Sequence, residues 1–315
     1  MNHSDGREQS AVAIWLDSFV DVESLTQALR AFYELIKPRI ALLIVISTSV
    51  GYSYGVGQHF NLVTFFNTLL GTALLAAGSA TLNQWYERDL DALMNRTKTR
   101  PIPAGIITPR RALTFGVTVS VIGFLELLAF VNVLAAALGL LTSLAYLFAY
   151  TPLKRKGPIC TTIGAFPGAM PPLIGYAAAS GHLTLQAWVL FAILFLWQFP
   201  HFHAIAWLYR EEYEKVGIKM LAVVKPRGSA LNVEIMTALL LLIPATLAPT
   251  FLHMAGKVYF VAAIVFNLAF LYFGIQMSAH HDRPRARKLL LASVIYVPLL
   301  FAFLVIDNPR FTSLF

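Results

Sequence analysis

The sequence predicts an all-α, multi-pass membrane protein, with about nine transmembrane helices around a central cavity that opens to the cytoplasmic side. Hydrophobic residues make up 57% of the 315 residues, whereas charged residues make up only 13%. Soluble domains average about 25% charged residues. Long apolar runs are the second observation, because about 20 apolar residues cross a ~30 Å hydrocarbon core. Most of the runs have no polar stripe, which excludes a soluble helical bundle.

Nine runs have the length of a membrane span. They cover residues 39–57, 62–82, 113–131, 133–150, 160–178, 184–200, 230–251, 258–277 and 288–306. Before the first run, apolar residues recur at helical spacing over residues 19–36, which predicts an amphipathic helix on the membrane surface that ends before Pro38. We therefore divide the chain into a cytoplasmic tail with this interfacial helix, 1–37, and an intramembrane domain, 38–315.

Basic residues predict the orientation. If the amino terminus is inside, the inside segments are the start of the chain and the loops near 83–112, 151–159, 201–229 and 278–288. All of the 24 Lys and Arg residues except Lys257 and Arg310 then lie inside, as the positive-inside rule requires. The amino terminus is expected in the cytoplasm and the carboxyl terminus in the periplasm. Topology explains the net charge of +8, so no nucleic acid partner is expected.

The composition of the first residues indicates which membrane the protein occupies. It is acidic and resembles neither a secretory signal nor an Arg-rich transit peptide. This favours a bacterial inner (plasma) membrane over an organelle.

The end of the second run carries three oxygen-bearing side chains at helical spacing. Asn83, Glu87 and Asp91 follow one another at i, i+4 and i+8, which places them on one helix face over ~12 Å. Mg²⁺ prefers such ligands, and it usually binds one or two carboxylates together with phosphate oxygens and water. Ordinary interfacial charges are the alternative, but carboxylates on an apolar helix face are costly, at ~2.5–3.5 kcal/mol each near the bilayer centre.

A cationic cluster follows this face, formed by Arg96, Lys98 and Arg100. Guanidinium and ammonium groups suit the remaining oxygens of a diphosphate. The pattern Asn-x-x-x-Glu-x-x-x-Asp followed by Arg-Thr-x-x-Arg-Pro resembles the first motif of the UbiA-type intramembrane prenyltransferases, and the similarity covers nearly the whole chain after residue ~30.

The resemblance implies a helical enzyme that binds an isoprenoid diphosphate through Mg²⁺ and opens its active site laterally to lipid. It implies that Asn83, Glu87 and Asp91 bind the metal and that these three act in catalysis. Arg96 and Arg100 would join them as catalytic residues, and Lys98 would bind the substrate.

The segment after the sixth run indicates the acceptor. Family members that prenylate aromatic acids or quinone precursors usually carry a second Asp-rich motif there, but residues 197–220 read WQFPHFHAIAWLYREEYEKVGIKM. This segment resembles the protohaem IX farnesyltransferases, with Glu212 in place of the family's Asp before Tyr213. The resemblance implies transfer of a farnesyl group from farnesyl diphosphate to a vinyl group of protohaem IX (haem b), with water addition, giving haem O and diphosphate.

Histidines and cations complete the expected site. By resemblance, His201 serves haem as an axial ligand or a proton-transfer group. His203 would point about 200° away from it on a continuous helix, although Pro200 leaves both orientations open. The expected substrate-binding residues are Lys98, Lys154, Arg155, His203, Arg210, Glu212 and Tyr213. For the basic loop at 154–156, positive-inside topology alone is the alternative explanation.

Two other functions stay open. One is a UbiA-type prenyltransferase that acts on a quinone precursor such as 4-hydroxybenzoate, and the other is a membrane transporter or a haem-binding membrane cytochrome. Transporters place polar residues near the midplane, whereas here they concentrate at one face. The expected partners are farnesyl diphosphate, haem b and the lipid bilayer, and the resemblance adds haem A synthase or assembly proteins of terminal oxidases.

Overall fold

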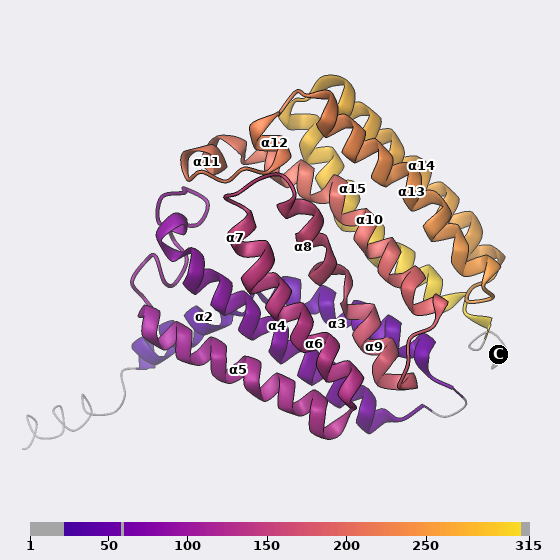
Figure 1. Ribbon diagram of the computed structural model, residues 1–315, viewed down its shortest axis with the longest axis horizontal. Helices are drawn as coiled ribbons and strands as arrows, with labels where there is room; N and C mark the ends of the chain where they lie inside the picture. Colours follow the sequence, from indigo (N-terminus) through magenta and orange to yellow (C-terminus); the bar gives the residue numbers. More distant parts are fainter. Residues whose placement is uncertain (1–21, 58–59, 310–315) are drawn as a thin grey trace, which may run out of the picture.

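A computed structural model describes residues 22–57 and 60–309, with side chains from residue 26 onward, and every regular element in these residues is helical (Figure 1). The elements are α2 (Val22–Leu35), α3 (Pro38–Gly55), α4 (Leu62–Asp91), α5 (Pro109–Phe130), α6 (Val133–Leu144), the π-helix η1 (Ala145–Tyr150), α7 (Thr151–Leu153), α8 (Cys160–Ala169), α9 (Pro171–Ser180), α10 (Leu185–Leu208), α11 (Arg210–Lys215), α12 (Leu221–Val224), α13 (Ser229–Phe251), α14 (Lys257–His280) and α15 (Arg283–Ile306). Residues 1–21, which include the predicted start of the interfacial helix, lie outside the described part.

The multi-span helical architecture is confirmed, but the count of nine spans is not. Seven helices of the described residues are long and apolar enough to cross a membrane, or eight if the bent pair Thr26–Leu35 and Pro38–Gly55 is one span. The predicted run 160–178 is divided into α8 and α9, of ten residues each. The break has a covalent cause, because Pro171 and Pro172 lack the N–H groups that would continue the helical hydrogen bonds.

Glycines let neighbouring helices approach closely. A Cβ atom on Gly175 of α9 would lie 1.9 Å from the carbonyl oxygen of Thr48 in α3, and one on Gly51 of α3 would lie 2.0 Å from the carbonyl oxygen of Pro172. Helices in lipid gain little from burying apolar surface against each other, so close backbone packing is a main source of their association. The α3–α9 pair is therefore a rigid wall of the bundle.

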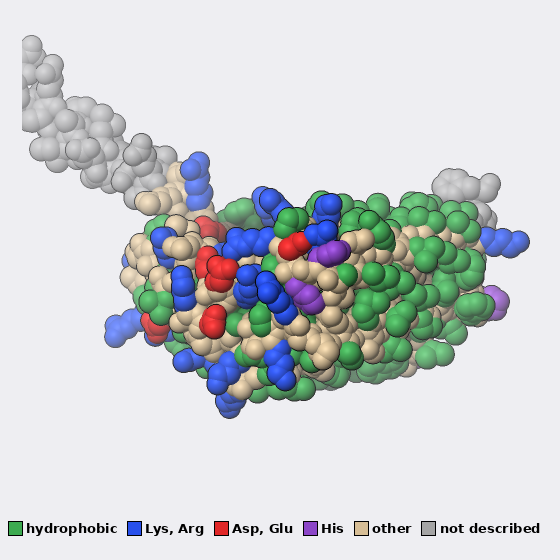
Figure 2. All heavy atoms as spheres, turned by 90° about the horizontal axis from the view of Figure 1, so that it is seen from above, with side chains coloured by type: hydrophobic (Ala, Val, Ile, Leu, Met, Phe, Trp, Pro, Cys, Tyr) green, Lys and Arg blue, Asp and Glu red, His purple; other side chains and the backbone are tan. Residues whose placement is uncertain are grey.

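The charged side chains gather at one end of the bundle, whereas much of the remaining surface in the same view is hydrophobic (Figure 2). The loop after α4 and the short helix α11 both lie at this end (Figure 1). Their contact, between Arg96 and residues of α11, is direct. The fold thus brings together the two segments that the sequence analysis singled out.

Helix α2 packs against the same end. Gln84 Nε2 of α4 donates a hydrogen bond to the carbonyl oxygen of Leu35 at 2.8 Å, and Ala31 and Leu35 join a small apolar cluster with the loop before α5. Leu29 and Tyr33 point outward. The helix therefore has one face on the protein and one apolar face outside, and its position at the membrane surface stays a prediction.

Candidate active site

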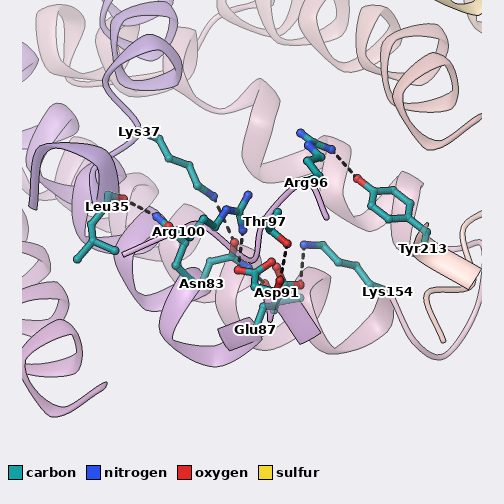
Figure 3. A network of polar contacts seen from close by, with 12 residues as sticks. Leu35, Lys37, Asn83, Glu87, Asp91, Arg96, Thr97, Arg100, Lys154 and Tyr213 are labelled. Atoms are coloured by element: carbon teal, nitrogen blue, oxygen red, sulfur yellow. Dashed lines mark hydrogen bonds and ion pairs between the residues drawn. The ribbon is translucent and has the colours of Figure 1, made fainter. Parts of the chain in front are cut away.

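The oxygen-bearing face of α4 is present in the structure. Asn83, Glu87 and Asp91 point into one cluster of polar contacts (Figure 3). Asn83 and Asp91 are buried, at 2% and 1% exposure, and the side chain of Glu87 is 13% exposed. The regular four-residue spacing on an unbroken helix is what aligns them.

Two partly buried ion pairs hold the carboxylates. Lys154 Nζ lies 2.8 Å from Glu87 Oε1, and Arg100 Nη1 lies 2.6 Å from Asp91 Oδ2. Buried charges need such partners, since an unpaired charge in a dry site is costly. Burial lowers the pKa of Lys154, but the Glu87 carboxylate together with Tyr150 and Tyr146 more than offsets burial and raises this pKa above its usual range.

A third cation, Lys37, reaches the cluster from the junction of α2 and α3. Its Nζ lies 3.5 Å from Asn83 Oδ1, and Asn83 Nδ2 donates to Thr151 Oγ1 at 3.2 Å. Lys37 adopts φ 49° and ψ 64°, a left-handed conformation that non-glycine residues rarely adopt and that costs about 1–3 kcal/mol. Burial, together with the positive charges of the two other cations, lowers the pKa of Lys37 to about 7.

Sequence reasoning missed Lys37. The predicted division between a tail, 1–37, and a membrane domain, 38–315, separates this residue from the site that its side chain enters (Figure 3). The only signal in the sequence is its place directly before the proline that begins the first apolar run.

Arg96 connects the two predicted motifs rather than joining the carboxylates. Its backbone N–H donates to Glu212 Oε2 at 3.1 Å and its Nη1 donates to Tyr213 Oη at 3.0 Å. The guanidinium also lies 4.3 Å from the centroid of the Tyr209 ring. Figure 3 shows it directed toward Tyr213, away from the metal-binding candidates. Glu212 and Tyr213 thus fix the loop after α4.

Three predicted residues lie at the periphery of this cluster. Lys98 is exposed and donates only to Asn95 among the described residues, at 3.0 Å. Arg155 is exposed as well. Arg210 lies over the ring of Trp207, with 4.0 Å to its centroid. None of them reaches the carboxylates.

A cavity of about 350 Å³ extends from the cluster into the bundle. Lys37 lines one part of it and Trp197 and His201 of α10 line another, while most of the remaining wall is apolar or aromatic. Two of the residues that line this cavity, Leu43 on α3 and Val294 on α15, are exposed. The predicted central cavity is therefore present, and its lateral opening to lipid stays a prediction.

His201 has a defined hydrogen-bonding partner. Its Nδ1 lies 2.8 Å from Ser293 Oγ of α15, and Ser293 Oγ donates its own hydrogen to the carbonyl oxygen of Leu290 at 2.6 Å. When the serine hydroxyl donates to Leu290 in this way, it accepts from the imidazole, and the histidine then carries its hydrogen on Nδ1 and a lone pair on Nε2. The ring also stacks on Trp197, with centroids 4.7 Å apart. Sequence analysis did not find Ser293.

His203 lies on another side of α10 and does not line the cavity. It is fully buried, and its Nε2 lies 3.2 Å from Glu234 Oε2 of α13. α10 continues as one helix through Pro200, so residues two apart point in different directions, as the helical geometry predicts. The structure thus brings His201, but not His203, to the cavity.

Comparison with known proteins gives consistent matches. The model of the UbiA prenyltransferase family matches residues 44–304. The chain is 48% identical over 290 residues to the protoheme IX farnesyltransferase of Solibacter usitatus, which covers 89% of this chain and 99% of the relative. It is 39% identical over 294 residues to the protein of the same name from Aquifex aeolicus, covering 92% and 99%.

Solved structures with low sequence identity share the fold. A digeranylgeranylglyceryl phosphate synthase matches with a TM-score of 0.75 at 17% identity, covering 89% of this chain and 98% of that chain. A UbiA homolog from Archaeoglobus fulgidus bound to GPP and Mg²⁺ matches with a TM-score of 0.60 at 16% identity, covering 87% and 99%.

Proposed function

Since the chain belongs to the UbiA prenyltransferase family, we propose that it transfers the farnesyl group of farnesyl diphosphate to a vinyl group of protohaem IX (haem b), giving haem O and diphosphate. One observation carries the proposal: a single cavity is lined both by Lys37, whose Nζ lies 3.5 Å from Asn83 Oδ1, and by the imidazole of His201. The relatives named protoheme IX farnesyltransferase, which match almost over their whole length, support this acceptor.

The reaction breaks the C–O bond of farnesyl diphosphate, the vinyl π bond of the haem and one O–H bond of water, and it forms a C–C bond and a C–O bond. The C–O bond of farnesyl diphosphate breaks and its electron pair leaves with the diphosphate. The vinyl π electrons then form the new C–C bond, and the oxygen of a water molecule bonds to the resulting haem-side cation and releases a proton. The protein must therefore stabilise a departing anion, shield two cations and direct one water molecule.

The α4 face is suited to hold Mg²⁺ with the diphosphate. Two carboxylates and an amide oxygen fit an ion that prefers oxygen ligands and keeps phosphate and water oxygens in its shell. Among the described residues no three Asp, Glu, His or Cys side chains surround one point, so the diphosphate would have to complete the shell. When bound there, Mg²⁺ would neutralise charge that develops on the leaving oxygens. Asn83, Glu87 and Asp91 would hold it.

The cations of the cluster are positioned for the departing diphosphate. Lys154 and Arg100 already lie within 2.8 Å of the carboxylates that would share the diphosphate complex, and Lys37 reaches the cluster near Arg100, on the side opposite Lys154 (Figure 3). Charges fixed in advance stabilise a leaving anion without further reorganisation in the transition state.

The cavity walls are suited to stabilise and shield the cations that form during the reaction. Tyr146, Tyr150 and Trp197 line the cavity together with aliphatic residues. Aromatic faces attract cations, and a mostly apolar wall keeps water from the allylic cation until the C–C bond has formed. A lateral opening beside the exposed lining residues of α3 and α15 would admit a prenyl chain from the lipid.

We expect His201 to interact with the haem acceptor. With its hydrogen on Nδ1, the imidazole has Nε2 free to bind the haem iron or to take the proton from the added water. We place the protein in a bacterial inner membrane with the charged end in the cytoplasm, where the positive-inside rule directs basic loops, and with haem A synthase or oxidase assembly proteins as receivers of the product.

The test is a reconstituted reaction. Purified protein in lipid nanodiscs receives haem b, farnesyl diphosphate and Mg²⁺, and mass spectrometry follows the mass of haem O; a parallel reaction contains 4-hydroxybenzoate instead of haem. Haem O should form only in the first reaction. Prenylated 4-hydroxybenzoate without haem O would assign the chain to the quinone branch of the family.

A further inference from the structure

A second cavity, of about 270 Å³, lies outside the active site at the beginning of α15. It is lined by Tyr272, Phe273 and Gln276 of α14 and by Pro284, Arg285 and Lys288 of α15. None of these residues contributes to the carboxylate–cation cluster or to the farnesyl-transfer cavity. The reaction proposed above does not use it.

The charge of this cavity is positive. Its lining includes two cations and no carboxylate. Arg285 is paired with Asp282, the residue that caps α15, but Lys288 is exposed and makes no hydrogen bond or ion pair with the described residues. The Gln276 amide adds a neutral donor. The cavity therefore offers uncompensated positive charge and hydrogen-bond donors to an anion.

An apolar strip continues from the cavity along the same two helices. Leu268 of α14 and Leu291 and Ile295 of α15 are exposed, as is Tyr272 at the cavity itself. Each lies one or two turns deeper than a cavity residue on the same helix face, because residues three, four and seven apart share a face. A polar cavity with aromatic rings and an adjoining apolar strip has the same amphipathic order as a phospholipid at the membrane interface.

We propose that this cavity binds the phosphate headgroup of an anionic phospholipid, whose acyl chains lie along the strip between α14 and α15. Charge complementarity selects an anionic headgroup over a zwitterionic one, and basic pockets between membrane helices are suited to such headgroups. A free phosphate would satisfy Lys288 but would leave the apolar strip uncovered. The proposal does not depend on which acceptor the enzyme prenylates.

The experiment compares two exposed basic residues near the starts of long helices. Arg111 lies in the first turn of α5, which likewise begins with a side-chain cap and a proline, and it lines neither of the two cavities described above. Delipidated protein is mixed with equimolar phosphatidylglycerol and phosphatidylcholine, and native mass spectrometry measures the retained lipid. We expect wild type and Arg111→Gln to prefer phosphatidylglycerol by about fivefold, the factor for one cation at an anionic surface, and Lys288→Gln to lose the preference.

A second pair of variants separates the cavity from diffuse charge. Gln276→Trp fills the cavity without changing the charge and should abolish the preference, whereas Ile275→Trp, at an exposed neighbour outside the cavity, should keep it. Thermal unfolding of each variant checks that the fold persists. Equal losses in Lys288→Gln and Arg111→Gln, retained preference in Gln276→Trp, or displacement of phosphatidylglycerol by millimolar inorganic phosphate would each overturn the proposal.

Discussion

Asp91 and Asp89 lie two residues apart on α4 in opposite environments. Asp91 is 1% exposed and is bound by Arg100, whereas the side chain of Asp89 is 82% exposed and lies 3.6 Å from Arg88. Asp91→Asn removes the carboxylate that we propose as a Mg²⁺ ligand and leaves the partly buried Arg100 without its counter-ion. We expect it to lower the rate of haem O formation about 100-fold or more, since single electrostatic contacts to a reacting anion have effects of that order.

The matched control is Asp89→Asn, which should stay within roughly twofold of wild type because exposed ion pairs contribute little. Haem O formed per minute at saturating substrates measures both variants. Equal losses at the two positions would show that the net charge of the helix end matters, and not a ligand face.

Ser293 is a positioning residue for His201. Ser293→Ala removes the acceptor of the Nδ1 hydrogen, so the imidazole would no longer be held in one tautomer and orientation. We expect about tenfold slower haem O formation, the usual effect of losing a partner that orients an imidazole, and unchanged affinity for a farnesyl diphosphate analogue by calorimetry. Ser293→Thr keeps the hydroxyl and should restore most of the rate. An unchanged rate of haem O formation in Ser293→Ala would show that the serine does not position His201.

The site was predictable where its geometry is local. Asn83, Glu87 and Asp91 lie within one helix, so periodicity alone fixes their common face. Lys37 and Ser293 depend on contacts across 46 and 92 residues, and helix packing rather than any nearby pattern decides which distant lysine or serine arrives there.

At the scale of helices, the α3–α9 contact should be intolerant of added atoms. In Gly175→Ala the new Cβ would lie 1.9 Å from the Thr48 carbonyl oxygen, which is backbone and cannot rotate away. We expect destabilisation by about 1–3 kcal/mol, typical of overpacking, seen as a lower thermal midpoint in detergent. Gly157→Ala is the control, because its Cβ would meet nothing within 4 Å. Similar midpoints for both variants would contradict the close packing.

Prolines account for two differences between the predicted and the observed helices. Hydropathy indicated one span over 160–178, but hydropathy does not register missing N–H groups, and the structure breaks this run after Ala169. The reverse happened at α10, where Pro200 suggested disruption and the helix continues. In both cases the packing of the surrounding helices stabilises the observed conformation, and this packing cannot be deduced from composition.

For the whole molecule, the charge distribution predicts the orientation. Reporter domains inserted after Ser180, between α9 and α10, and fused after Phe315 should both be found outside the cytoplasm, since basic loops are retained inside during insertion. Alkaline phosphatase activity of the two fusions measures this. A cytoplasmic position for either reporter would invalidate the predicted alternation of spans.

The ion pairs of the cluster also determine how ligands cooperate. Mg²⁺ alone would take Glu87 and Asp91 from their partners and leave Lys154 and Arg100 as buried, unpaired cations; a diphosphate alone would do the opposite. Each ligand should therefore raise the affinity for the other about tenfold or more, a reciprocal coupling that calorimetry with and without EDTA measures. Equal affinity in both conditions would contradict it. We therefore expect the site to respond to the concentration of the magnesium–diphosphate complex. Abundant magnesium by itself would leave the two ion pairs intact.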